Sequence, residues 1–334
     1  MTRKTLSALF ALLLTLALVL SACGNSGGGA SPTPGATPSH EATPDVTPDA
    51  TPEATPDAPA DTAITVIDQT GNTVRLDAPA QKVVALTPAM NEIIYALGSF
   101  DILVGRGEYC DYPAEVFNIP SVGTGTDTNI EQIIALDPDL VVMATMAQTT
   151  EQVDQLVNAG IAVYSSDAAS IAETYESIEQ IGALIGKSAE ADELVASMKA
   201  SFEELSKEKL SGTLYFEISP LEWGLWTAGQ GSFMNEVADI IGLTNIFSDV
   251  GAWAEISEEQ VIERNPDYIM TITMYFGEGP TPVDEILSRA AWKDITAVKN
   301  NAILNLPDNE LSRPGPRLVD GAKALYDFVK NAGQ

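Results

Sequence analysis

The chain has 334 residues, with 17 lysines and arginines against 47 aspartates and glutamates, and a formal net charge of −30. A body this acidic repels nucleic acid at ordinary salt, so partners recognised through phosphates are excluded. The one histidine, His40, lies in a low-complexity stretch, which excludes histidine triads and imidazole metal sites from the folded part. Two cysteines, Cys23 and Cys110, are too few for a disulfide framework or a thiolate metal cluster.

Residues 1–22 have the organisation of a signal peptide. Two basic residues precede an apolar run from Leu6 to Leu20, and small residues lead to Cys23. The run is shorter than the roughly 20 residues that span a bilayer comfortably, which disfavours the alternative of an uncleaved membrane anchor. Leu20-Ser21-Ala22-Cys23 resembles the lipobox of bacterial lipoproteins, which implies lipidation of Cys23. We therefore expect a lipid anchor on the extracytoplasmic face of the cell membrane.

Residues 23–61 have the composition of a tether. They contain a run of three glycines and six Thr-Pro pairs, and they include no lysine or arginine. Such a stretch buries too little apolar surface to offset the entropy of ordering it. Proline and like-charge repulsion favour an extended spacer, so we predict a disordered tether between the anchor and the body.

The body, residues 62–334, alternates short apolar runs with amphipathic stretches. It opens with a predicted β-hairpin, in which two alternating segments at 64–68 and 73–76 flank Gly71-Asn72. Further predicted elements are, in chain order, a strand at 82–86, a helix at 89–97, a strand at 140–143 and, after another helix, a strand at 161–164. This alternation predicts an α/β fold with mostly parallel sheets.

Two sequence patterns occur once in each half of the body. Met90-Asn91-Glu92 returns as Met234-Asn235-Glu236. The second pattern, with equal spacing in both copies, is Glu131-Gln132 before Pro138-Asp139 and Glu259-Gln260 before Pro266-Asp267. Repeats in the same order indicate two lobes built on one plan, an N-terminal lobe at 62–186 and a C-terminal lobe at 211–334.

Residues 187–210, between the lobes, predict one long helix. Leu194, Met198, Phe202 and Leu205 lie at helical spacing in a segment rich in Ala, Glu, Lys and Leu. At 1.5 Å per residue the helix is about 35 Å long. A rigid rod with one lobe at each end leaves a cleft between the lobes, and ligands favour such clefts.

Six segments of the body carry a family resemblance, namely residues 86–92, 104–113, 129–131, 226–229, 253–259 and 313–317. Through them, residues 61–334 resemble the helical-backbone (cluster A, class III) solute-binding proteins of ABC importers, and most of all the vitamin B12-binding members. The resemblance implies two α/β lobes, a single long rigid helix between them, a ligand cleft and a monomer that binds its ligand without catalysis.

The resemblance assigns ligand contacts to Tyr109, Trp226, Trp253 and Arg313. These residue types suit a flat macrocycle, because aromatic side chains each bury about 150–250 Å² and arginine reaches amide or carboxylate edges. The alternatives are ordinary core positions for the tryptophans and a salt bridge for Arg313.

Further candidates lie near these residues in the sequence. Trp223 and Trp226 share a segment bounded by proline and glycine, which predicts a loop, and aromatic residues on loops often face ligands. Pro88, Tyr275 and Glu310 complete the candidate set.

We expect the cargo to be a cobalt corrinoid similar to cobalamin, and we expect no cofactor or metal site of the protein's own. Two departures leave other metal chelates open: Gly125 replaces an aromatic residue of the vitamin B12-binding members, and Asn309 replaces an acidic one. Haem would need Tyr, Met or Cys as an axial ligand, and Cys110 follows Tyr109, although a buried thiol is the favoured interpretation. A ferric siderophore would favour more positive charge.

Glu131 and Glu259 match the glutamates through which the family docks onto basic residues of paired membrane subunits. The partners implied are a permease dimer and its ATPase. The internal repeat supports this independently, because a two-lobed protein that meets a two-fold transporter should present one acid per lobe. The alternative is an acid at a helix N-terminus, stabilised by the dipole by about 0.3–1 kcal/mol.

The leading hypothesis is therefore a surface-anchored binding protein of an ABC importer. An enzyme that uses a Glu/Asp pair in the cleft is a second class, but the sequence places no two acids at a defined reacting centre. A surface sensory module is a third.

Overall fold

The computed structural model describes residues 63–145, 148–273, 279–306 and 310–332. The predicted signal peptide, Cys23 and the predicted tether lie outside the described residues, as does Tyr275. Within the described ranges, no helix is both long enough and apolar enough to cross a membrane.

The N-terminal lobe is built on a four-stranded parallel sheet of order β4-β3-β5-β6. Its strands are β3 (Val83–Ala85), β4 (Leu103–Arg106), β5 (Leu140–Ala144) and β6 (Ala162–Ser166), and its helices are α1 (Pro88–Ala96), α2 (Ile130–Leu136), α3 (Thr150–Asn158) and α4 (Ile171–Leu184). The lobe opens with the antiparallel hairpin β1 (Ile64–Ile67) and β2 (Thr73–Leu76). The central strands are apolar on both faces because helices cover both sides of the sheet.

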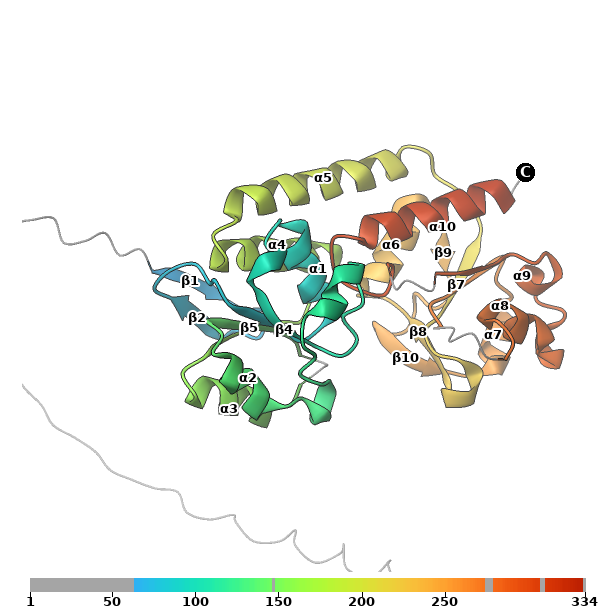
Figure 1. The fold of residues 1–334 in the computed structure, drawn as a ribbon. Coiled ribbons are helices and arrows are strands. Elements are labelled where there is room, and N and C mark those ends of the chain that lie inside the picture. The colour runs from blue at the N-terminus through green and yellow to red at the C-terminus, as the bar shows by residue number, and fades with distance from the viewer. Residues whose placement is uncertain (1–62, 146–147, 274–278, 307–309, 333–334) are drawn as a thin grey trace, which may run out of the picture. The chain divides into compact units, whose positions relative to one another are not determined.

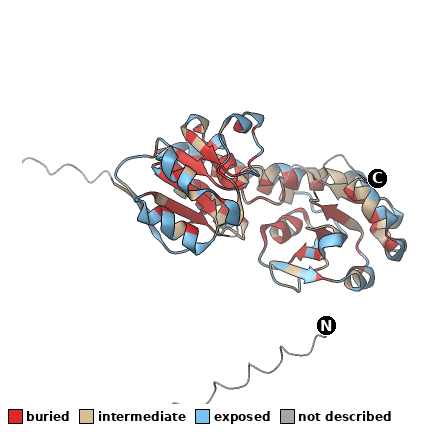
Figure 2. Ribbon diagram, turned by 60° about the horizontal axis from the view of Figure 1, so that its bottom comes forward, coloured by how far each residue is buried: buried red, intermediate tan, exposed pale blue. Residues whose placement is uncertain are grey.

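The C-terminal lobe repeats this architecture with a parallel sheet of order β12-β11-β7-β9. Its strands are β7 (Thr213–Glu217), β9 (Thr244–Asn245), β11 (Tyr268–Thr271) and β12 (Ile303–Asn305), and its helices are α6 (Phe233–Ile241), α7 (Glu258–Arg264), α8 (Pro282–Ser288), α9 (Thr296–Lys299) and α10 (Leu318–Ala332). A separate antiparallel pair joins β8 (Leu225–Ala228) to β10 (Trp253–Ile256). Figure 2 shows that the buried residues concentrate in the strands of both sheets. The predicted two-lobed α/β fold with mostly parallel sheets is confirmed.

The helix α5 (Ser188–Ser206) extends along both lobes in Figure 1. Its N-terminal half contributes Ala191, Val195 and Met198 to the core of the N-terminal lobe, and Phe202 belongs to the core of the C-terminal lobe. The helix ends four residues before the predicted end at Leu210, because the Leu210 amide donates to the carbonyl of Ile241 and begins the approach to β7. One helix is thus part of both cores.

The repeated Glu-Gln pattern marks the first turn of matching helices. In α2 the N-cap Asn129 accepts from the amide of Gln132, and in α7 the N-cap Ser257 accepts from the amide of Gln260. Both helices then end on a residue with left-handed backbone, Asp137 with φ 51° and Asn265 with φ 43°.

The repeated Pro-Asp pattern joins neighbouring strands of each sheet. The Asp139 carboxylate accepts from the amides of Gln81 and Lys82, at 2.7 and 2.9 Å, just before β3. The Asp267 carboxylate accepts from the amide of Thr213, at 2.8 Å, at the start of β7. Each aspartate therefore binds the beginning of its own strand to the beginning of the parallel neighbour, which gives this repeat a structural role.

The candidate ligand surface and the contacts between the lobes

Trp226 and Trp253 lie on one face of the β8–β10 pair. Trp226 is opposite Glu255 and Trp253 is opposite Ala228, so the two tryptophans are diagonal neighbours on the same face. They are 41% and 44% exposed, and Trp253 makes an edge-to-face contact with Phe233 at 5.7 Å between ring centroids. Core positions for these two rings are excluded by their exposure.

The predicted loop at Trp226 is wrong, because this residue lies within β8. The strand forms because Leu225 and Thr227 are buried on one side while Trp226 points to the other. Trp223 ends a short 3₁₀ turn just before the strand and is 72% exposed.

On the N-terminal lobe, Tyr109 is 60% exposed in the segment that follows β4. Arg106, at the end of that strand, holds the backbone of this segment through hydrogen bonds. Its buried guanidinium donates to the carbonyls of Ile119, Gly107 and Glu108, at 3.0–3.1 Å. Gly107 is required here because a Cβ would lie 2.1 Å from the carbonyl oxygen of Leu86. Arg106 was not among the residues predicted from the sequence, where its only signal is a charged residue at the end of a buried strand.

Cys110, next to Tyr109, is fully buried, and burial raises the pKa of its thiol to about 12. The thiol lies 3.7 Å from the carbonyl oxygen of Ala85. A protonated, enclosed sulfur is a poor metal ligand. Burial and the raised pKa therefore disfavour Cys110 as an axial ligand.

The Cys110 environment predicts slow thiol chemistry. With a pKa near 12, about one thiol in ten thousand is ionised at pH 8. In a chain that carries Cys23→Ser, we expect almost no reaction with an aromatic disulfide reagent at pH 8, and complete reaction in guanidinium chloride. Rapid labelling of the folded chain would contradict this placement.

Arg313 is bonded to two acids of the opposite lobe. Its Nη1 donates to Glu92 at 2.9 Å and to Asp111 at 2.6 Å, and its Nη2 donates to Asp111 at 3.1 Å. Burial alone would lower the pKa of the Arg313 guanidinium, but the hydrogen bonds to Asp111 and Glu92 outweigh it, so the pKa is raised. The salt-bridge alternative is thus realised, as a mostly buried pair rather than a surface one.

Arg317 completes this group of charges. It donates from Nε and Nη2 to Glu92, at 3.0 and 2.8 Å, and its guanidinium lies 4.2 Å from the ring centre of Tyr112. Glu310, a candidate ligand residue, lies 3.7 Å from Arg317. We call Glu92, Asp111, Glu310, Arg313 and Arg317 the interlobe ion cluster. The roles of Glu92, Asp111 and Arg317 were not predicted from the sequence.

The second copy of the Met-Asn-Glu pattern also reaches across the lobes. Glu236 on α6 accepts from the amide of Ile171, the first residue of α4, at 2.8 Å. Beside it, the amide of Phe233 donates to the carbonyl of Ala169 at 2.6 Å. The repeated glutamates Glu92 and Glu236 therefore both bind the opposite lobe.

Removing charge from Glu92 should destabilise the fold. Its side chain is 2% exposed and accepts hydrogen bonds from two guanidinium groups, so Glu92→Gln removes the buried carboxylate that both of them share. We expect the free energy of unfolding to fall by about 3 kcal/mol in a denaturant titration. The control Glu115→Gln, at an exposed position, should change it by less than about 0.5 kcal/mol. A similar small change for Glu92→Gln would contradict the role of the cluster.

The C-terminal lobe contains a second group of charges, in which two acids, Glu217 and Glu285, share one arginine. Two neighbouring carboxylates can form a reacting centre in an enzyme. Glu217 forms two hydrogen bonds to Arg289, at 2.7 and 3.0 Å, and Glu285 bonds the same guanidinium. Burial raises the pKa of Glu217 despite this partner. Arg289 thus pairs with both carboxylates, the buried Glu217 and the partly exposed Glu285, and this group links the end of β7 to α8 rather than forming a reacting centre.

The remaining predicted residues have simple placements. Pro88 is the first residue of α1 and is half-buried. Glu131 and Glu259 are exposed at the second position of α2 and α7. Hydrogen bonds from its own amide and from Ser257 lower the pKa of Glu259, so it is ionised at neutral pH.

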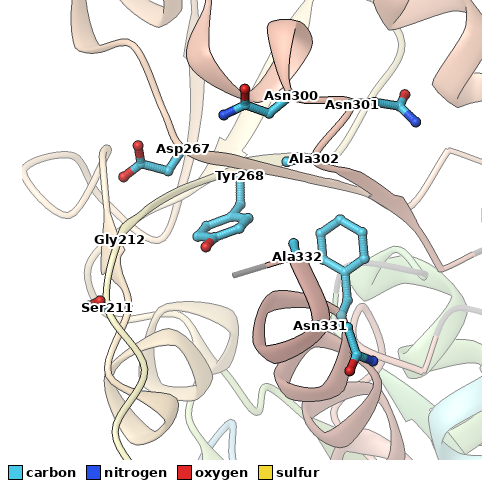
Figure 3. Close-up of a pocket in the computed structure, with 10 residues that line it drawn as sticks. Ser211, Gly212, Asp267, Tyr268, Asn300, Asn301, Ala302, Asn331 and Ala332 are labelled. Atoms are coloured by element: carbon cyan, nitrogen blue, oxygen red, sulfur yellow. The ribbon is translucent and has the colours of Figure 1, made fainter. Parts of the chain in front are cut away.

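A half-open cavity of about 680 Å³ lies elsewhere in the C-terminal lobe, where β7, β11 and β12 begin and α10 ends. Figure 3 shows the ring of Tyr268 in the middle of its lining, between Gly212 and the end of α10. None of the predicted ligand residues lines it, and the Asp267 carboxylate there already accepts from Thr213. Over the described ranges, no group of three or more His, Cys, Asp or Glu side chains could hold a metal ion.

Residues 83–310 match the family model described as periplasmic binding protein. The chain is 32% identical over 275 residues to the uncharacterized ABC transporter substrate-binding lipoprotein YvrC of Bacillus subtilis, across 80% of this chain and 85% of that protein. It is 30% identical over 257 residues to the vitamin B12-binding protein of Salmonella choleraesuis, across 75% of this chain and 90% of that protein. The solved structure of a possible iron-binding (periplasmic solute-binding) protein of Staphylococcus epidermidis superposes with a TM-score of 0.63 at 30% identity, across 75% of this chain and 98% of that one. The chain therefore belongs to the periplasmic binding protein family of ABC transporters, whose members bind solutes and are not enzymes.

Proposed function

We propose that this chain captures a corrinoid and delivers it to the permease of an ABC importer. The observation that carries the proposal is the aromatic face of the β8–β10 pair, where Trp226 and Trp253 are exposed on the same side. Trp223 lies next to this face, and Tyr109 is exposed on the other lobe. The similarity to a vitamin B12-binding protein supports the same cargo.

Exposed aromatic faces match the flat plane of a macrocycle. Exposed indole rings keep apolar surface in contact with water. A corrin plane that covers two of them removes this surface from water, which favours binding. The backbone hydrogen bonds of the strand pair hold the two positions that carry the tryptophans, so little backbone freedom is lost on binding. The lobes should move little on binding, because α5 belongs to both cores and the repeated glutamates join the lobes.

In this proposal Glu131 and Glu259 meet basic residues of the paired permease subunits, one from each lobe. Their matching positions on α2 and α7, their exposure and their charge support this role. Lipidation of Cys23 would hold the protein, as a monomer, at the extracytoplasmic face of the membrane, with residues 23–61 as a tether. The similarity to a substrate-binding lipoprotein supports the anchor.

A ferric chelate or haem is the second candidate cargo. The specific observation in its favour is the 30% identity to a possible iron-binding protein over most of the body. For haem, Tyr109 offers an exposed phenol as an axial ligand, whereas Cys110 is enclosed.

The proposal is tested by visible absorption titration of the chain with cyanocobalamin, cobinamide, haemin and a ferric hydroxamate, together with tryptophan quenching. We expect saturable binding of a corrinoid with quenching of Trp226 and Trp253. Binding of haemin or the ferric hydroxamate alone would preserve the importer role and replace the cargo.

A further inference from the structure

The two guanidinium groups of the interlobe ion cluster are already paired with carboxylates. Arg313 forms hydrogen bonds to both oxygens of Asp111 and to Glu92, and Arg317 forms two to Glu92. The interlobe ion cluster contains two guanidinium groups and three carboxylates, which leaves one net negative charge. The cluster itself therefore offers a ligand no excess of positive charge.

Asp111 is the member of the cluster that faces solvent most. Its side chain is 40% exposed, against 2% for Glu92 and 10% for Arg313. It lies two residues from Tyr109, in the segment that Arg106 organises. Asp111 is therefore the more exposed partner of Arg313, the residue that the family resemblance assigns to the ligand.

A carboxylate on the ligand would have to displace Asp111 to reach Arg313. The displaced carboxylate would lose two charge-assisted hydrogen bonds and would stay close to the incoming anion. A ligand amide does not have to displace Asp111. Its nitrogen can donate to the exposed Asp111 carboxylate and its oxygen can accept from Arg313 while the Asp111–Arg313 pair stays intact.

Resting on the proposed function, we propose that Asp111 is a specificity-determining residue that occupies Arg313 and thereby selects metal chelates with uncharged edges over those with carboxylates. Corrinoids with intact side-chain amides satisfy this condition. Within any class of cargo, the less anionic member binds more tightly.

The test compares ligands of different charge, and the matched pair differs by one hydrolysed amide. Full-length chain in detergent is titrated with cyanocobalamin and with its monocarboxylic acids, in which one side-chain amide is hydrolysed. A neutral ferric trihydroxamate and anionic ferric citrate form a second pair. For the wild-type chain we expect Kd to be at least tenfold higher for at least one monocarboxylic acid than for the amide.

Asp111→Asn keeps the shape and removes the charge, so it should reduce that ratio to below about threefold. The matched control is Asp101→Asn, an exposed acid that follows the C-terminal end of α1, and it should leave the wild-type ratio unchanged. Circular dichroism and thermal unfolding establish that each variant is folded.

The outcomes separate the two proposals. Binding of the ferric pair alone contradicts the corrinoid cargo, and the ratio within that pair then decides the role of Asp111. Equal or tighter binding of the anionic ligand by the wild-type chain overturns the selectivity proposal without any variant. An unchanged ratio in folded Asp111→Asn overturns it as well, and leaves the proposed function in place.

Discussion

Replacing Trp226 and Trp253 together with alanine is expected to weaken corrinoid binding by at least 100-fold while the chain remains folded. Both rings are exposed on one face of the β8–β10 pair, so their removal takes away the aromatic surface that the macrocycle covers. Central aromatic anchors each contribute about 2 kcal/mol or more to binding when truncated. The measurement is absorption titration with cyanocobalamin, with each single variant measured beside the double one.

The control for this result is Ile67→Ala. Ile67 is an exposed apolar residue on the β1–β2 hairpin of the other lobe, so its truncation removes apolar surface away from the proposed ligand face. It should leave Kd within about twofold. If the double tryptophan variant is folded and binds as tightly as wild type, the ligand does not lie on this face.

Charge reversal at both docking positions should abolish transport without changing ligand affinity. In the variant Glu131→Lys/Glu259→Lys, each lobe would present a lysine where the permease is expected to present basic residues, and like charges at an interface cost several kcal/mol. We expect uptake of labelled cyanocobalamin in proteoliposomes with the permease and ATPase to fall at least 100-fold. The affinity for cyanocobalamin should stay within about twofold, because both residues are exposed at the starts of α2 and α7.

A matched variant carries the same change of net charge at other exposed acids. Glu151 occupies the second position of α3, the equivalent helix position, and Glu263 lies in the last turn of α7. Glu151→Lys/Glu263→Lys should retain most of the uptake. Normal uptake by the Glu131→Lys/Glu259→Lys variant, or weakened ligand binding with uptake intact, would remove the docking role.

Elements whose signals are local could be predicted closely. The β1–β2 hairpin follows from alternation around Gly71-Asn72, and the strand predicted at 140–143 is observed as Leu140–Ala144. Both depend on contacts of neighbouring residues and on burial by the covering helices. The strand that contains Trp226 was not predicted from the sequence. Gly224 indicates a turn locally, and the partner strand β10 begins 27 residues after Trp226. Strand pairing at that distance leaves no local signal.

The candidate site also contains residues that could be predicted from the sequence and contacts that could not. The exposed aromatic residues Tyr109, Trp226 and Trp253 could be proposed from the sequence, because aromatic residues near turns and a family resemblance single them out. Arg313 could be named, but its partners could not. Glu92 is 221 residues away from it, and only the packing of α1 against the segment before α10 brings the two together.

The sequence by itself determined the βα alternation, the two similar halves and the single helix between them, because periodicity, caps and turns act over a few residues. It also showed that Met-Asn-Glu occurs twice. Only the tertiary structure decided that Glu92 and Glu236 each bind the opposite lobe, and that Arg313 is occupied by Asp111. Those contacts join residues far apart in the chain, and their energies depend on burial and on which charges the folded lobes bring within hydrogen-bond distance.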